Sequence, residues 1–272
     1  MLTFRSFRSG SSGNLLLLEG RIGRRRTRLL IDCGIRSQRG CRQALEEEVG
    51  LGKPIDALIV THAHGDHINY SALRVMADLE IPVYLHQRTS MEVTSRYLNP
   101  YRLPARVDPS SFLLRRFGTA AFSIGMFTIK PVPVPHAPEV TTHAFVIRCG
   151  SHRLLVANDF NDPQAIAPHI HNCDFIYLES NHDLELLRLY FNPASLYHLS
   201  NPAAAQLLQY ALQSSRRPPG AVMLGHLSED RNRPALALET VRAALGPNSG
   251  GDDLALIAAP RHTPSEIVVI AE

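Results

Sequence analysis

Residues 61–67 read Thr61-His62-Ala63-His64-Gly65-Asp66-His67 and directly follow Ala57–Val60, an apolar run that predicts a short buried strand. This stretch holds four side chains of the kind that bind metal ions. In an extended loop, residues i and i+2 point to the same side, so His62 and His64 can bind one ion. Asp66 and His67 are adjacent and diverge, which suits a second ion beside the first. Imidazole and carboxylate ligands suit Zn²⁺ best, and Mn²⁺ or Fe²⁺ as well.

The composition is that of a globular protein. The chain has 272 residues, of which 44% are hydrophobic and 19% charged, so it is not a disordered chain. We expect a single domain over residues 1–272, because one large α/β domain of this length needs no linker. The longest apolar run, Leu254–Ala259, is far shorter than the ~20 residues of a membrane helix. The N-terminus has no apolar core typical of a signal peptide, so we expect a cytoplasmic protein without membrane attachment.

The basic residues are unusual in kind. The formal net charge is only +3, but just two of the 28 basic residues, Lys53 and Lys130, are lysines. Arginine binds phosphate in a bidentate manner, and five arginines crowd the segment Arg21–Arg28. This segment is either a phosphate-binding arm for nucleic acid or a solvated turn. The four cysteines form no CxxC pair, and we expect them to be reduced and structural.

Alternating apolar runs and turns predict two sheets with helices outside them. Apolar runs predict strands at residues 15–18, 29–31, 57–60, 83–85, 122–131, 144–148, 154–157, 175–178 and 267–270, with a polar turn at residues 20–28. Apolar periodicity predicts helices at residues 71–79, 203–212 and 234–245. Asn232 is a candidate cap for the last helix, and Pro234 lies in its first turn.

The motif HAHGDH after a buried strand resembles the metal-binding motif of the metallo-β-lactamase superfamily. The resemblance implies a four-layer αββα sandwich with its site at one edge of the two sheets. It also implies three further ligands, and His136, Asp159 and His226 fit their expected places in the chain. Site one would then consist of His62, His64 and His136. Site two would consist of Asp66, His67 and His226, and Asp159 would bridge the two ions.

Shorter segments resemble the phosphodiesterase and nuclease branch of this superfamily. They most resemble the YycJ/WalJ type of small bacterial metallohydrolase, which is linked to exonuclease action on DNA. The segments are Ser9–Asn14 (SGSSGN), Leu178–Asp183 (LESNHD), Tyr197–Asn201 (YHLSN) and His226–Asn232 (HLSEDRN). The bridging Asp159, where many true β-lactamases have cysteine, argues against antibiotic hydrolysis. One departure is His136-Ala137-Pro138, where the branch commonly has His-Asp-Ala.

The resemblance also implies roles for residues beyond the ligands. Asp66 and His198 are the predicted catalytic residues, with His198 protonating the leaving oxygen, a task that suits the pKa of histidine. Asp32 is either a hydrogen-bond partner of a ligand histidine or an ordinary turn carboxylate. His182 either orients a ligand or stabilises a turn, and the loop with Ser12 and Asn14 either binds phosphate or is only a turn. No role is predicted for His86, His143, His152, His169, His171 and His262.

The leading hypothesis is therefore a hydrolase with two divalent metal ions that acts on nucleic acid as a phosphodiesterase, in the manner of a DNA exonuclease. One alternative is hydrolysis of a small phosphodiester, a thioester as in glyoxalase II, or a lactone. An alternative of another class is a non-catalytic scaffold that binds nucleic acid. The complete set of seven ligands argues against the scaffold. Metal identity, the choice between DNA and RNA, and the oligomeric state stay open.

Overall fold

The computed structural model describes residues 1–50, 52, 54–99, 101, 103–104, 107–246 and 254–271. Within these residues, the chain forms two seven-stranded sheets. The first sheet contains β1 (Leu2–Arg8), β2 (Leu15–Ile22), β3 (Arg25–Cys33), β4 (Ala57–Ile59), β5 (Val83–His86), β6 (Leu114–Phe117) and β14 (Val268–Ala271). Its strand order is β14-β1-β2-β3-β4-β5-β6. The strands from β3 to β6 are parallel, whereas β14, β1, β2 and β3 pair in antiparallel fashion.

The second sheet has the order β13-β12-β11-β10-β9-β8-β7. Its strands are β7 (Phe122–Ile124), β8 (Phe127–Val134), β9 (Thr142–Cys149), β10 (His152–Ala157), β11 (Phe175–Glu179), β12 (Ala221–Gly225) and β13 (Ala255–Ala258). The strands from β10 to β13 are parallel, and those from β7 to β10 are antiparallel.

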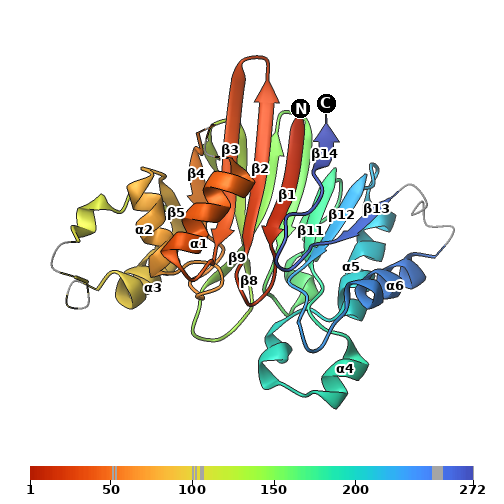
Figure 1. The fold of residues 1–272 in the computed structure, drawn as a ribbon. Helices are drawn as coiled ribbons and strands as arrows, with labels where there is room; N and C mark the ends of the chain where they lie inside the picture. Colours follow the sequence, from red (N-terminus) through yellow and green to blue (C-terminus); the bar gives the residue numbers. More distant parts are fainter. Residues whose placement is uncertain are drawn as a thin grey trace.

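Helices cover the outer face of each sheet, as Figure 1 shows. The first sheet carries α1 (Gln38–Gln43), α2 (Tyr70–Asp78) and α3 (Gln87–Tyr97). The second sheet carries α5 (Asn201–Ser214) and α6 (Pro234–Leu245), while α4 (Leu184–Leu189) projects beyond the edge of the sheets. A π-helical turn spans Ala44–Val49, and short 3₁₀ turns span Pro109–Ser111, Pro163–Ala165, Ala167–His169 and Pro193–Tyr197.

Strand alternation builds three apolar layers. Successive side chains of a strand point to opposite faces, so Leu29 and Ile31 of β3 lie between the two sheets, while Leu30 packs toward the helices. In the second sheet, Val156 faces the first sheet and Leu155 faces the helices. The predicted four-layer αββα sandwich is therefore confirmed.

The parallel strands β3, β4, β10, β11 and β12 all end at the same edge of the sandwich. Ligand sites of open α/β sheets lie outside the carboxyl ends of such strands. In Figure 1 this is the lower edge, from which α4 projects, and the tip of the β2–β3 hairpin lies at the upper end. The HAHGDH motif begins at His62, three residues after the last residue of β4, and therefore lies at the lower edge.

Most predicted elements are present, with some errors in extent. The segment Gly20–Arg28 is not a broad turn, because β2 continues to Ile22 and β3 begins at Arg25. The reversal is confined to Gly23 and Arg24, and Gly23 adopts a φ of 58° that favours glycine. The single predicted strand at residues 122–131 is a hairpin of two strands, β7 and β8, which turns at Gly125 and Met126.

The predicted cap of α6 is wrong. Arg233 is the N-cap residue, and no side chain caps the helix. Asn232 is buried, and its Nδ2 donates instead to the Ser180 carbonyl at 2.7 Å and to Asn201 Oδ1 at 2.8 Å. It ties the loops after β11 and β12 together at the edge where the metal-binding motif lies.

Among the described residues, no helix combines the length and the apolar character that a membrane span requires.

Two histidines without a predicted role lie together near this edge. His86 at the end of β5 and His143 in β9 have ring centroids 4.3 Å apart, and both are buried. Burial and, to a smaller extent, the neighbouring His86 lower the pKa of His143 to about 4. The folded protein therefore keeps His143 neutral at pH values where the unfolded chain would bind a proton.

This pair predicts a loss of stability in acid. Because the folded-state pKa lies below the usual value of about 6.5, His143 costs no stability above that value. Stability falls as the pH drops toward about 4, by roughly 2 kcal/mol at about pH 5. We expect His143→Leu to reduce the loss seen in urea unfolding between about pH 7.5 and 5 by that amount. His262→Gln, at an exposed position, serves as the control. An equal acid loss in wild type and His143→Leu would contradict this account.

Candidate metal centre

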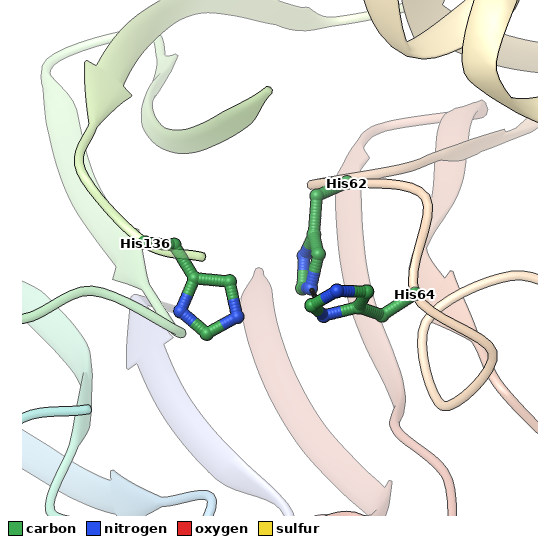
Figure 2. A group of neighbouring side chains, drawn as sticks. All are labelled: His62, His64 and His136. Carbon is green, nitrogen blue, oxygen red and sulfur yellow. Dashed lines mark hydrogen bonds between the residues drawn. The ribbon is translucent and has the colours of Figure 1, made fainter. Parts of the chain in front are cut away.

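Three of the predicted ligands form one cluster that joins the two sheets. His62 and His64 follow β4 of the first sheet, and His136 follows β8 of the second. Figure 2 shows their rings converging from these two sides. His62 Nε2 lies 3.0 Å from His64 Nδ1, and one ligand atom from each of the three lies within 4.8 Å of the others. This set can hold one metal ion.

The other four predicted ligands lie beside this cluster. Asp66, His67 and His226 also have ligand atoms within 4.8 Å of one another. His67 Nε2 is 3.5 Å from Asp66 Oδ2, and His226 Nε2 is 3.4 Å from the same oxygen. Asp159 groups with His62 and His67 on one side and with His226 on the other. The structure thus brings together all seven residues, with Asp159 between the two sets.

Glu179 is the important residue that the sequence argument missed. It is fully buried at the end of β11, inside the quoted segment LESNHD. Its Oε1 lies 2.7 Å from His198 Nδ1 and 3.0 Å from His226 Nδ1. Its Oε2 accepts hydrogen bonds from two backbone N–H groups, of Phe160 and Leu199. The sequence feature that could have indicated Glu179 is an acidic residue at the end of an apolar strand, because a carboxylate is buried there only when it has partners.

Polar groups hold the Nδ1 atoms of four histidines and so determine which nitrogen is available. Asp32 Oδ2 lies 2.7 Å from His67 Nδ1, and Glu179 holds His226. His136 Nδ1 donates to the Tyr197 carbonyl at 2.9 Å, and His62 Nδ1 lies 3.0 Å from Thr61 Oγ1. A partner on one ring nitrogen sets the tautomer and leaves the other as a metal ligand. Nε2 is therefore the available atom of these four rings.

The backbone is strained at three of the strand ends. Asp32, Asp159 and His226 have φ values of 58°, 55° and 53°, in the left-handed region that non-glycine residues rarely adopt. Each such conformation costs of the order of 1–3 kcal/mol and persists only where surrounding contacts hold it. All three side chains take part in the network around the two sets.

Burial and the crowding of charges shift the pKa values in opposite directions. Burial raises the pKa of Asp66 and of Asp159, but the adjacent histidines lower both to well below the usual value. Burial lowers the pKa of His226, but Asp159, Asp66 and Glu179 together raise it to about 10. By contrast, burial is the largest cause of the lowered pKa of His62. The carboxylates thus stay ionised, and they favour positive charge between them.

The donor set fits divalent metal ions. Asp159 is buried, and its Oδ2 lies 3.0 Å from His67 Nε2, yet it accepts no well-aligned hydrogen bond from the described residues. A buried carboxylate oxygen needs either such a donor or a cation. Imidazole nitrogens and carboxylate oxygens are the ligand types that Zn²⁺ and related ions prefer.

The residues predicted to support the site have different contacts. Asn14 is buried, with its Nδ2 donating to the Asp66 carbonyl at 3.1 Å and lying 3.1 Å from His67 Nε2. Ser12 is exposed, and the hydroxyl near the cluster is that of Ser9, which accepts from the His226 N–H at 2.8 Å. Ser12 points to solvent, and its contact with a substrate phosphate stays a prediction.

Asp32 and His182 differ in whether the side chain contacts a predicted ligand. The Asp32 carboxylate contacts Nδ1 of His67, a predicted ligand. This contact agrees with the first alternative for Asp32, a hydrogen-bond partner of a ligand histidine. The His182 ring is buried, but its Nδ1 has no hydrogen-bond partner among the described residues. Its neighbour Asn181 makes the contact instead, by donating from Nδ2 to the His226 carbonyl at 2.9 Å. Alternation along the extended chain turns one side chain toward the cluster and the next away.

The arginine-rich hairpin lies far from this centre. The strand β3 has nine residues, so its hairpin end is roughly 25–30 Å from the end that carries Asp32. Arg26 pairs with Glu19 at 2.7 Å, and Arg28 is buried against the same carboxylate at 3.3 Å. These two arginines stabilise the hairpin, which favours the interpretation of Arg21–Arg28 as a structural element rather than a phosphate-binding arm.

The comparison with protein families agrees with the fold and with this donor set. Residues 27–224 match the family described as the beta-lactamase superfamily domain. The chain belongs to the metallo-β-lactamase superfamily. The metallo-β-lactamase fold protein YhfI from Bacillus subtilis superposes with a TM-score of 0.65 at 18% identity, over 98% of this chain and 99% of that chain. The fold is therefore that of the superfamily.

Two relatives with curated names cover most of the chain. One, exodeoxyribonuclease WalJ of Streptococcus pneumoniae, is 28% identical over 86% of this chain and 84% of its own length. The other, exodeoxyribonuclease YycJ of Bacillus anthracis, is 26% identical over 90% of this chain and 89% of its own. The predicted resemblance to this branch is confirmed, as is the prediction of a metal-dependent hydrolase of the superfamily.

Glu179 provides a test of how the centre is held. We expect Glu179→Gln to lower bound metal and hydrolysis about 10- to 100-fold, because one carboxylate oxygen becomes an NH2 donor that would face either the two imidazoles or the Phe160 and Leu199 N–H groups. Metal content by mass spectrometry and phosphodiester hydrolysis would be measured together. Glu185→Gln, on the exposed face of α4, is the matched control. Normal metal content and turnover in Glu179→Gln would show that the histidines need no such support.

Proposed function

We propose that this protein is a phosphodiesterase that uses two divalent metal ions to hydrolyse DNA. The observation that carries the proposal is the pair of adjacent donor sets with Asp159 between them. His62, His64 and His136 would hold one ion, and Asp66, His67 and His226 would hold the other. Such a pair of ions lowers the pKa of bound water and neutralises charge on a phosphoryl group.

Zinc is the ion that we propose for both sites. The predominance of imidazole over carboxylate ligands favours Zn²⁺, and the same ligands accept Mn²⁺ or Fe²⁺. Asp66 would contribute to catalysis as a ligand, because its mostly buried, ionised carboxylate would offset the charge of the second ion.

His198 is suited to protonate the leaving oxygen. Its Nδ1 is 2.7 Å from Glu179 Oε1, and its ring centroid lies 5.0 Å from that of His136 and 5.1 Å from that of His226. Burial lowers the pKa of His198, but Glu179 raises it to above the usual value. Glu179 thus favours the protonated ring, and the Nε2 proton is the one that it could transfer to the departing oxygen.

Nucleic acid is the substrate class that the relatives support. Both relatives reported above are named as exodeoxyribonucleases. Hydrolysis of a DNA backbone, a phosphodiester with alkoxide leaving groups, requires both neutralisation of the phosphoryl charge and a proton donor for the leaving oxygen. We observe nothing that favours a thioester or lactone over a phosphodiester. A non-catalytic scaffold does not need the complete donor set.

An assay on end-labelled single- and double-stranded DNA and RNA, with Zn²⁺ or Mn²⁺, tests the substrate class. We expect the wild type to degrade DNA and Asp159→Ala to be inactive and depleted of metal, because that carboxylate lies between the two sets. The inactive variant, purified in parallel, controls for contaminating nucleases. Degradation of RNA alone, or of neither polymer, would refute the proposed substrate, and full activity of Asp159→Ala would refute the centre.

A change of leaving group tests His198. We expect His198→Asn to keep its metal but to lower kcat on DNA by about 10²- to 10⁴-fold. Hydrolysis of bis(p-nitrophenyl) phosphate should change little, because nitrophenolate is a stable anion that needs no proton. His262→Asn controls for the loss of a histidine as such. Equal losses on both substrates would show that His198 does not act as the proton donor.

A further inference from the structure

Exposed apolar side chains gather on one short segment beside the metal centre. Six of the thirteen large apolar side chains that are exposed in the described part of the chain lie within residues 184–197. Tyr190 is 58% exposed and Phe191 67%, directly after α4. This six-residue helix is anchored by one buried side chain, that of Leu187. An exposed cluster of this kind marks a site of interaction.

The two aromatic residues form one wall of a cleft. The cleft has a volume of about 590 Å³, which is within the range of ligand pockets. One wall consists of Leu189, Tyr190 and Phe191, and the other comes from the loop after β12. The residues of the second wall are Glu229, Asp230, Arg231 and Arg233.

Hydrogen bonds tie both walls to the candidate metal centre. The first wall follows Glu179 in the chain, and the second follows His226. The Asp183 N–H donates to the Arg231 carbonyl and the Ser228 N–H to the Asn181 carbonyl, each at 2.8 Å. Asn181 in turn holds the His226 carbonyl. In Figure 1, α4 projects from the same edge of the sandwich to which the metal-binding strand ends lead.

The chemistry of the cleft suits a nucleobase rather than a phosphate. Its two arginines and two acidic residues cancel in charge, and Asp230 Oδ2 lies 3.6 Å from Arg231 Nη1. Carboxylates would repel a phosphate, but they can accept hydrogen bonds from the amino groups of a base, while guanidinium groups donate to its carbonyl and ring nitrogen atoms. Exposed aromatic rings bind unpaired bases by stacking, with little dependence on sequence.

We infer that this cleft is a base-binding subsite that holds an unpaired nucleotide of single-stranded DNA next to the metal centre. The inference rests on the proposed function and adds to it that the substrate is bound as a single strand. A paired base has both faces covered by its neighbours and its edge occupied by its partner. Such a base cannot enter the cleft, so the subsite selects unpaired ends.

The absence of tryptophan from the sequence permits a direct test. Phe191→Trp keeps an aromatic ring and places the single tryptophan of the protein in the cleft. We expect its fluorescence to be quenched by a phosphorothioate-linked thymidine oligonucleotide, which resists hydrolysis. An abasic oligonucleotide of the same length and charge should not quench it, because it has no ring to stack. Equal quenching by both oligonucleotides, or by neither, overturns the subsite.

Affinities of the alanine variants provide the second arm. We expect Tyr190→Ala and Phe191→Ala each to weaken binding of the thymidine oligonucleotide by about 5- to 150-fold, the range for loss of one stacked base. Binding of the abasic oligonucleotide should not change. Tyr210→Ala removes an exposed ring from α5, on the outer face of the second sheet, and is the matched control.

Two outcomes separate the possible failures. If the alanine variants weaken self-association by light scattering and leave both affinities unchanged, a second copy of the chain covers the cleft and the inference is wrong. Hydrolysis of bis(p-nitrophenyl) phosphate reports on the metal centre alone. A wild type that hydrolyses this ester but shows no difference between thymidine and abasic oligonucleotides refutes the subsite only. A wild type that hydrolyses neither ester nor DNA refutes the proposed function itself.

Discussion

Two buried carboxylates, Asp32 and Glu179, hold the candidate metal centre in place. Each closes a strand of a different sheet and each lies against the Nδ1 atom of a histidine, His67 or His226. A carboxylate buried at this depth is stable only with partners, so the same contacts that satisfy the acids also orient the imidazoles. These contacts can offset the cost of the left-handed backbone conformations at Asp32, Asp159 and His226.

The sandwich supplies the rigidity that these contacts need. Apolar side chains on both faces of each sheet are buried, so β3, β4, β10, β11 and β12 cannot slide without exposing a whole face. Their ends therefore stay in register across the two sheets. The loops that follow can differ in length and content without loss of the core, and they carry the chemistry: the HAHGDH motif, the turn with His136, and the segment from α4 to His198.

The segment from α4 to His198 has two roles in this view. At its end, the Tyr197 carbonyl accepts a hydrogen bond from His136, and His198 lies beside Glu179. Its beginning presents Tyr190 and Phe191 to solvent at the rim. A helix anchored by so few contacts is among the less stable parts of a fold, which is where substrate-binding elements are commonly found. In the proposed function, binding of a DNA strand and positioning of His198 would thereby be linked through one short stretch of chain.

Much of this protein followed from its sequence alone. The spacing of His62, His64, Asp66 and His67 after a buried strand indicated a two-metal loop, and apolar runs located most strands and the helices α2, α5 and α6. Local patterns suffice there because ligand spacing within a loop and side-chain alternation within a strand depend on neighbours in the chain.

Only the tertiary structure showed which side chains from distant segments of the chain contact one another. The role of Glu179, the choice of Asn181 over His182 and of Ser9 over Ser12, and the cleft beside α4 all depend on which side chains meet across the fold. The same holds for Asn232, which the sequence suggested as a helix cap and which instead joins two loops. A sequence lists the donors and acceptors of a buried network, but their pairing is set by strand order and by the direction in which each turn points its side chains.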